Sequence, residues 1–223
     1  TANNPERPLI PFNFQGRALR DAPIKEGDEA YPLIIVSHGY VGSRFLMTYL
    51  TENLASKGYV VMAIDHTEST YRDANGFQST LLNRAKDIDF VLKQATNMAT
   101  DSDHFLSGNL DTDRVGLIGY SMGGFGVLNV GGAGYSNFAV GFFKNMTGGS
   151  DAIATLGVNH PEFVHKKIDP RIKAIVAFAP WGMTNGVWDE TGLANLQAPT
   201  LFVAGSQDDI SGYENGIKAI YEG

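Results

Sequence analysis

Short β-branched runs alternate along this chain with longer segments in which apolar residues recur at helical spacing. The strand-like runs cover residues 31–37, 59–64, 115–119, 171–178 and 200–204. Helical spacing is found at residues 43–57 and 78–98, and an apolar stretch compatible with a helix follows residue 121. Strands that alternate with helices predict an α/β fold with a mostly parallel sheet flanked by helices.

The length of 223 residues predicts one domain, residues 1–223. Residues 131–168 interrupt the alternation with many glycines and no clean period. This segment is longer than an ordinary connection between a helix and a strand. We therefore expect an insertion after the helix that follows residue 121, either as a lid or wall over a site or as a mobile segment.

Composition and charge exclude several classes of function. The net charge is −7 and no basic run is present, so nucleic acid is not an expected partner. No window approaches the roughly 18 apolar residues that a membrane span requires. The absence of cysteine removes disulfides, thiol nucleophiles and zinc–thiolate sites. The chain starts with Thr1 rather than Met, which favours a removed leader and a secreted or periplasmic protein over a cytoplasmic one.

The sequence from Gly119 to Gly123 matches the pattern G-x-S-x-G, with Ser121 at its centre. In this pattern small residues let a strand and a helix approach closely, while the serine hydroxyl stands exposed on a strained turn. The strand-like run before it and the apolar run after it supply the expected context. Ser121 is therefore predicted to be a nucleophile, the alternative being an ordinary serine in a glycine-rich turn.

Three blocks of the chain, in order, resemble the α/β-hydrolase family. They are residues 32–40 together with 54–65, residues 114–124, and residues 199–209. Within that family the chain is similar to bacterial dienelactone hydrolases, platelet-activating-factor acetylhydrolase-like lipases and cutinase-like polyester hydrolases, over about residues 31–223. The resemblance implies an α/β-hydrolase fold and a serine carboxylesterase that cleaves a small-molecule or polymeric ester. It implies no cofactor, and no metal-binding motif is found.

Several residues around the expected nucleophile receive roles. The amide of Met122 lies at a helix N-terminus, where negative charge is favoured, and is one expected oxyanion donor. The resemblance implies the amide of Tyr40 as the second donor, with His38 bracing that loop. Trp181, at the end of a strand, is expected to form a pocket wall and to contact substrate, or else to belong to the core. His66 is expected on the rim of the site, as a substrate contact or as a residue with no catalytic duty.

The catalytic acid is expected after the strand at residues 200–204. Asp208 is the favoured candidate, and the adjacent Asp209 remains an alternative because a shift of one residue in the loop would exchange them. The alternative for either carboxylate is that it only caps the loop.

The resemblance also predicts another helix and a last strand after the acid, with the catalytic histidine in the loop that follows. We expect this last strand to be missing from the chain, so that the domain is incomplete at its C-terminal end, and no histidine follows Asp209. We expect the base beyond Gly223, on a companion segment or a separate chain. A less favoured base is His160 or His165 in the insertion, and His104 is expected in an exposed loop. A serine peptidase or amidase shares the same chemistry, and a non-catalytic binding module would explain the missing histidine.

Overall fold

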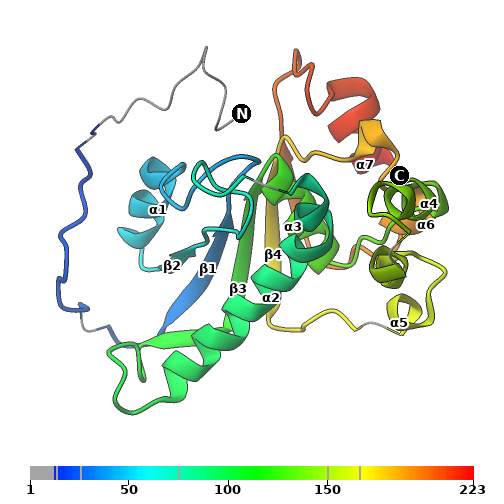
Figure 1. Ribbon diagram of the computed structural model, residues 1–223. Coiled ribbons are helices and arrows are strands. Elements are labelled where there is room, and N and C mark those ends of the chain that lie inside the picture. The colour runs from blue at the N-terminus through cyan, green and yellow to red at the C-terminus, as the bar shows by residue number, and fades with distance from the viewer. Residues whose placement is uncertain (1–12, 14, 26, 75, 150, 166) are drawn as a thin grey trace.

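The computed structural model describes residues 13, 15–25, 27–74, 76–149, 151–165 and 167–223. Its described part contains a parallel sheet of five strands in the order β2-β1-β3-β4-β5 (Figure 1). The strands are β1 (Tyr31–Ser37), β2 (Val60–Ala63), β3 (Leu110–Tyr120), β4 (Ile172–Phe178) and β5 (Thr200–Val203). The predicted α/β class with a parallel sheet is confirmed, and the sheet is consistent with an α/β-hydrolase fold.

The helices alternate with these strands, as the sequence predicts. They are α1 (Thr48–Ala55), α2 (Phe77–Thr100), α3 (Met122–Val130), α4 (Asn137–Met146), α5 (Pro161–Val164), α6 (Glu190–Leu193) and α7 (Ala219–Glu222), with short 3-10 segments η1 (Asp151–Leu156) and η2 (Met183–Asn185) and a π-helical segment η3 (Tyr213–Lys218). None of the helices in the described ranges is both long and apolar enough to cross a bilayer.

Strand β3 is longer than the sequence predicts, because its start pairs separately with β1. Tyr31 and Pro32 lie opposite Leu110 and Asp111, and the register then shifts so that Leu33 lies opposite Val115. The charged residues between the two paired stretches hide this first part of the strand from an apolar pattern.

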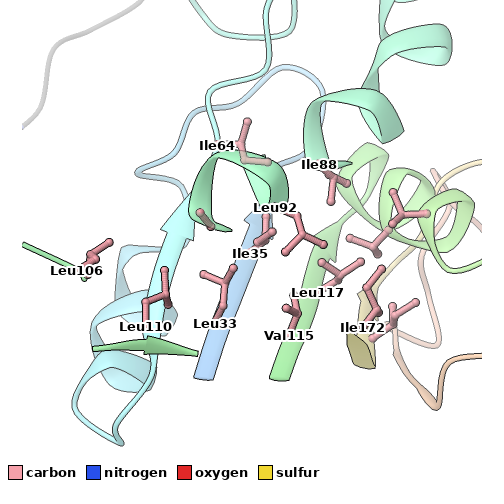
Figure 2. Packing of buried hydrophobic residues seen from close by; sticks show 14 residues of the cluster. Leu33, Ile35, Ile64, Ile88, Leu92, Leu106, Leu110, Val115, Leu117 and Ile172 are labelled. Atoms are coloured by element: carbon pink, nitrogen blue, oxygen red, sulfur yellow. The ribbon is translucent and has the colours of Figure 1, made fainter. Parts of the chain in front are cut away.

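One face of the sheet packs against α2 and α3. Leu33, Ile35 and Leu117 from the strands meet Ile88 and Leu92 of α2 in a single buried cluster (Figure 2). The two α2 residues are four apart and lie on one side of the helix, which is why helical spacing in the sequence predicts this contact.

The opposite face of the sheet packs against α1. Ile34, Val36 and Ile118 are buried there together with Met47, and Leu50 of α1 packs against them. Successive residues of β1 therefore point to opposite faces, and both faces are apolar, as expected for a buried parallel strand.

The expected site residues follow the carboxyl ends of the strands, which lie at one end of the sheet. Ser37 lies opposite Gly119, and Phe178 lies opposite both Tyr120 and Val203. Because these parallel strands end together, the loops that follow β1, β3, β4 and β5 meet at this end of the sheet.

The segment 131–168 forms α4, η1 and α5 and is bonded to its surroundings. The Tyr135 hydroxyl donates to the carbonyl of Leu81 on α2, and the Gly134 and Ser136 amides donate to Gly192 and Val187. These bonds hold the segment beside α2 and α6.

Candidate active site

Ser121 occupies a strained backbone conformation between β3 and α3. Its φ of 53° and ψ of −113° lie in a region that non-glycine residues rarely adopt. Three hydrogen bonds hold it there. Its amide donates to Phe178 O at 2.8 Å, and its carbonyl accepts from Phe125 N at 3.0 Å and Trp181 N at 3.1 Å. The tertiary structure thus imposes the turn that the motif predicts.

The two glycines of the motif are required by close backbone approach. A Cβ on Gly119 would lie 2.1 Å from the carbonyl oxygen of Gly123, and a Cβ on Gly123 would lie 2.0 Å from the carbonyl oxygen of Ser37. Neither contact is sterically possible, so only glycine lets α3 start this close to the ends of β1 and β3.

Two backbone segments flank the serine as the expected oxyanion donors require. Met122 is the first residue of α3, so its amide has no acceptor within the helix and shares in the positive end of the helix dipole. The loop after β1 lies on the other side: a Cβ on Gly39, next to Tyr40, would be 3.3 Å from Ser121 Cβ.

A buried arginine of α2, Arg84, holds this loop through side-chain hydrogen bonds. Arg84 Nη1 donates to His38 O at 2.6 Å, and Nη2 donates to Ser69 Oγ. The loop is also tied by the Gly42 amide, which donates to Ser69 O at 3.1 Å. Burial lowers the pKa of Arg84 to about 9, so the guanidinium stays charged at pH 7.

His38 braces the same loop as a neutral ring. Its Nδ1 donates to Gly39 O at 2.6 Å, and its Nε2 accepts from the His66 amide at 3.3 Å. Burial lowers the pKa of His38 to about 4, which keeps the ring uncharged at pH 7.

His66 is buried, unlike the rim position expected from the sequence. Only 1% of the residue is exposed. Its Nε2 lies 2.8 Å from Ser37 Oγ and its Nδ1 lies 2.8 Å from Asp87 Oδ2, and burial lowers its pKa to about 4. The order serine, histidine, aspartate is that of a catalytic triad, but Ser37 is fully buried. With both ring nitrogens occupied below the surface, His66 has no ring atom to offer a substrate.

An aromatic row runs from the Tyr40 loop to Trp181. The ring centroids of Tyr40 and Phe77 are 5.4 Å apart, those of Phe77 and Trp181 are 5.3 Å apart, and both pairs meet edge to face. Trp181 also contacts the buried ring of Phe125 at 6.1 Å. Trp181 is half-buried and adjoins the serine through the bond from its amide.

The two candidate acids differ in their surroundings. Asp208 is half-buried, and its Oδ1 accepts from the amides of Ile210 and Ser211 at 2.9 Å each, whereas Asp209 is exposed. The Ser211 hydroxyl donates to Ala179 O at 2.9 Å. The loop after β5 is therefore tied to the loop after β4, with Asp208 as its capping carboxylate.

The structure brings none of the chain's five histidines, all of which it describes, into hydrogen-bonding contact with the Ser121 hydroxyl. His38 and His66 are buried, and the ring nitrogens of both are occupied by other partners. His160 and His165 flank α5, whose Phe163 packs beside Gly134, just past the end of α3 opposite Ser121. Helix α3 has nine residues and is about 14 Å long at its usual rise. Figure 1 shows α5 to the side of the sheet, level with the starts of β3 and β4 and away from the end of β3. His104 lies in the connection between α2 and β3, and so precedes β3, whereas Ser121 follows it.

Sequence reasoning missed Arg84, Asp87 and the aromatic residue Phe77. Arg84 falls on the apolar stripe of α2, between Leu81 and Ile88, and an arginine inside such a stripe is a usable signal for a buried polar network. No comparable signal marks Phe77, because a phenylalanine at the start of a helix normally indicates only core packing. Among the described residues, no group of three or more potential metal ligands is found.

Comparison with known proteins places this arrangement in a family. The PET hydrolase-like family matches residues 22–137, just over half of the chain, including the loop that carries Tyr40 and the serine turn. The chain belongs to the PET hydrolase-like family. This agrees with the resemblance to polyester hydrolases seen in the sequence.

Relatives of this PET hydrolase-like chain are bacterial. "Cutinase est1" of Thermobifida alba is 33% identical over 103 residues, which are 46% of this chain and 31% of the relative. "Cutinase 1" of Thermobifida cellulosilytica is 23% identical over 194 residues, covering 87% of this chain and 54% of the relative. "Bis(hydroxyethyl) terephthalate hydrolase" of Streptomyces coelicolor is 21% identical over 202 residues, covering 90% and 47%. The matches thus span about a third to a half of these relatives' lengths.

Proposed function

We propose that this chain carries the nucleophile and oxyanion site of a serine hydrolase that cleaves carboxylic esters. The observation that carries the proposal is the conformation of Ser121, held at positive φ with its hydroxyl at the N-terminus of α3. Residues held in such strained conformations cluster at active sites and need the surrounding structure to maintain them.

In the proposed reaction, Ser121 Oγ attacks the ester carbonyl and its proton passes to a base. The amides of Tyr40 and Met122 donate to the oxyanion that develops, and the alcohol leaves with the proton. Water then hydrolyses the acyl-enzyme by the reverse sequence of proton transfers. Asp208 is the proposed acid that orients the base, favoured over Asp209 by its partial burial.

We further propose that the base lies outside residues 1–223. The support is spatial. Two histidines are buried with their ring nitrogens occupied. Two more flank α5, past the end of α3 that is opposite Ser121, and His104 precedes β3. The less favoured bases His160 and His165 would have to cross the length of α3 to reach Ser121.

The ester class is supported by the names of the relatives, two cutinases and a bis(hydroxyethyl) terephthalate hydrolase. The partly exposed aromatic row beside Ser121 suits an ester with an apolar acyl or aryl part.

The test is chemical rescue of the missing base. Residues 1–223 are treated with a fluorophosphonate probe over a series of imidazole concentrations, and labelling is located by mass spectrometry. We expect labelling at Ser121 to rise with imidazole, since a small base can occupy the open position, and Ser121→Ala to remain unlabelled at every concentration. Labelling elsewhere, or at a rate independent of imidazole, would contradict the proposal of a serine that lacks only its base.

A non-catalytic binding module is the second candidate, favoured by the absence of a histidine at Ser121. It predicts no labelling of Ser121 at any imidazole concentration, nor in a longer native protein whose intact mass shows residues after Gly223. If labelling occurs, rates on p-nitrophenyl esters against peptide anilides separate an esterase from a serine peptidase, and faster turnover of the anilides would overturn the ester assignment.

A further inference from the structure

A hollow of about 410 Å³ opens beside the serine turn, between Trp181 and the helix α4. This volume lies within the range of small-molecule sites. Its wall is formed by Phe77 and Trp181 on one side and by residues of α4 on the other, and it is completed by residues 184–186. No charged side chain is among its lining residues in the described part of the chain.

Two lining residues of the hollow connect it to the proposed reaction centre. The Trp181 amide donates to the carbonyl of Ser121 at 3.1 Å, so the tryptophan that lines the hollow is bonded to the nucleophile's own backbone. Phe77 contacts Trp181 on one edge and Tyr40, the proposed oxyanion residue, on the other. Trp181 and Phe77 thus belong both to the wall of the hollow and to the surroundings of the serine turn and the Tyr40 loop.

The far wall is an exposed aromatic face on an anchored helix. Phe138, Phe142 and Met146 recur every four residues and lie on one side of α4, with 65% and 50% of the two phenylalanines exposed. The other side of α4 is fixed by buried Ala139 and Phe143.

The start of α4 is fixed as well. Ser136 Oγ accepts from the Ala139 amide, and the Ser136 hydroxyl donates to Gly186 O at 2.7 Å. The Phe138 ring packs on Gly186, at the same corner. The apolar face is thus held toward the residues that follow Trp181. Its exposed hydrophobic surface is unfavourable in water, and a bound apolar ligand would cover it.

We propose that this hollow is a subsite for the apolar part of the ester substrate, a hydrocarbon or aryl group extending from the carbonyl at Ser121, and that α4 of the insertion determines its capacity. The assignment of an ester to this place rests on the proposed function. The apolar character of the occupant rests on the lining itself, which offers aromatic and thioether surface and few polar groups.

The test measures binding without catalysis. Residues 1–223 are titrated by calorimetry with N-methyloctanamide and N-methylacetamide, amide analogues that differ only in the length of the acyl chain. We expect the octanamide to bind at least roughly tenfold more tightly, the effect of burying about two methylene groups. Phe142→Ala should remove most of this preference, and Phe90→Ala, an exposed phenylalanine on α2 outside the hollow, should retain it.

Circular dichroism on both variants establishes that they are folded. Equal binding of the two amides by the unaltered chain, or an unchanged preference in folded Phe142→Ala, would overturn the subsite. Failure of the proposed function looks different: Ser121 would stay unlabelled by the fluorophosphonate while the chain-length preference and its loss in Phe142→Ala persist. In that case the hollow would still bind apolar groups, without an ester being cleaved.

Discussion

At the scale of single residues, the site depends on buried groups as much as on exposed ones. His38 and His66 both have pKa values lowered to about 4 by burial, against an ordinary value of 6.5. Each accepts a hydrogen bond at Nε2, which a protonated ring could not do. The two rings therefore must stay neutral for the loop before Tyr40 to keep its shape.

This neutrality predicts an acid-sensitive fold. Between pH 6.5 and pH 4 the unfolded chain binds protons at these histidines that the folded chain does not, so the free energy of unfolding falls as the pH falls through this window. Each histidine should cost about 1 kcal/mol at pH 5.5 relative to pH 7.5. Urea unfolding at several pH values measures this loss.

The variant His66→Gln isolates one of the two contributions. Glutamine cannot titrate, so the slope of unfolding free energy against pH should be roughly halved, whatever the variant's stability at pH 7.5. A slope equal to that of the unaltered chain would show that His66 is not responsible.

At the scale of elements, β1, β3 and α3 meet more closely than any side chain allows. The start of α3 is pressed against the end of β1, where Gly123 faces the carbonyl of Ser37. The positive φ of Ser121 costs on the order of 1–3 kcal/mol, and this contact between elements is part of what sustains it.

We therefore predict that Gly123→Ala destabilises the chain by more than about 3 kcal/mol or prevents folding, because its Cβ would lie 2.0 Å from a backbone oxygen that cannot easily move. Gly141→Ala is the matched control. Gly141 lies within α4, where an added methyl group would meet no other part of the chain within 4 Å, so the substitution should stabilise by up to about 1 kcal/mol through helix propensity. Chemical denaturation compares the two, and similar stabilities would refute the close contact.

At the scale of the whole molecule, one face of the sheet is buried against α1 near β1 and becomes exposed toward β5. The face starts with buried Val36 and Ile118 beside α1 and continues through half-buried Val176 to Leu201, which is 59% exposed. Leu201 and its neighbour on this face, Val203, lie on an edge strand of the described sheet. Such a surface favours binding of apolar dyes and self-association.

Leu201→Lys should lower the fluorescence of bound anilinonaphthalene sulfonate on residues 1–223, and reduce any self-association seen by gel filtration. Leu19→Lys replaces an exposed leucine outside the sheet and should change neither. Because both side chains are exposed, unfolding free energies should stay within about 0.5 kcal/mol. Equal dye binding by both variants would show that the β4–β5 face is not the apolar surface.

Sequence alone determined the order of strands and helices and the position of the serine turn. Both depend on local patterns: apolar periodicity over a few residues, and glycines at fixed offsets from Ser121. The sequence did not predict the start of β3, because Asp111 and Arg114 interrupt its apolar pattern. The pairing of Leu110 with Tyr31 also involves residues far apart in the chain.

Only the tertiary structure decided which side chains face one another. It buried His66 against Asp87, set Arg84 beneath the loop that carries Tyr40, and turned Phe138 and Phe142 of the insertion toward Trp181. These contacts join residues from different elements, so no local pattern encodes them. A histidine or phenylalanine in a sequence has the same letters whether it is buried beneath a site or lines it, and burial is a property of the assembled chain.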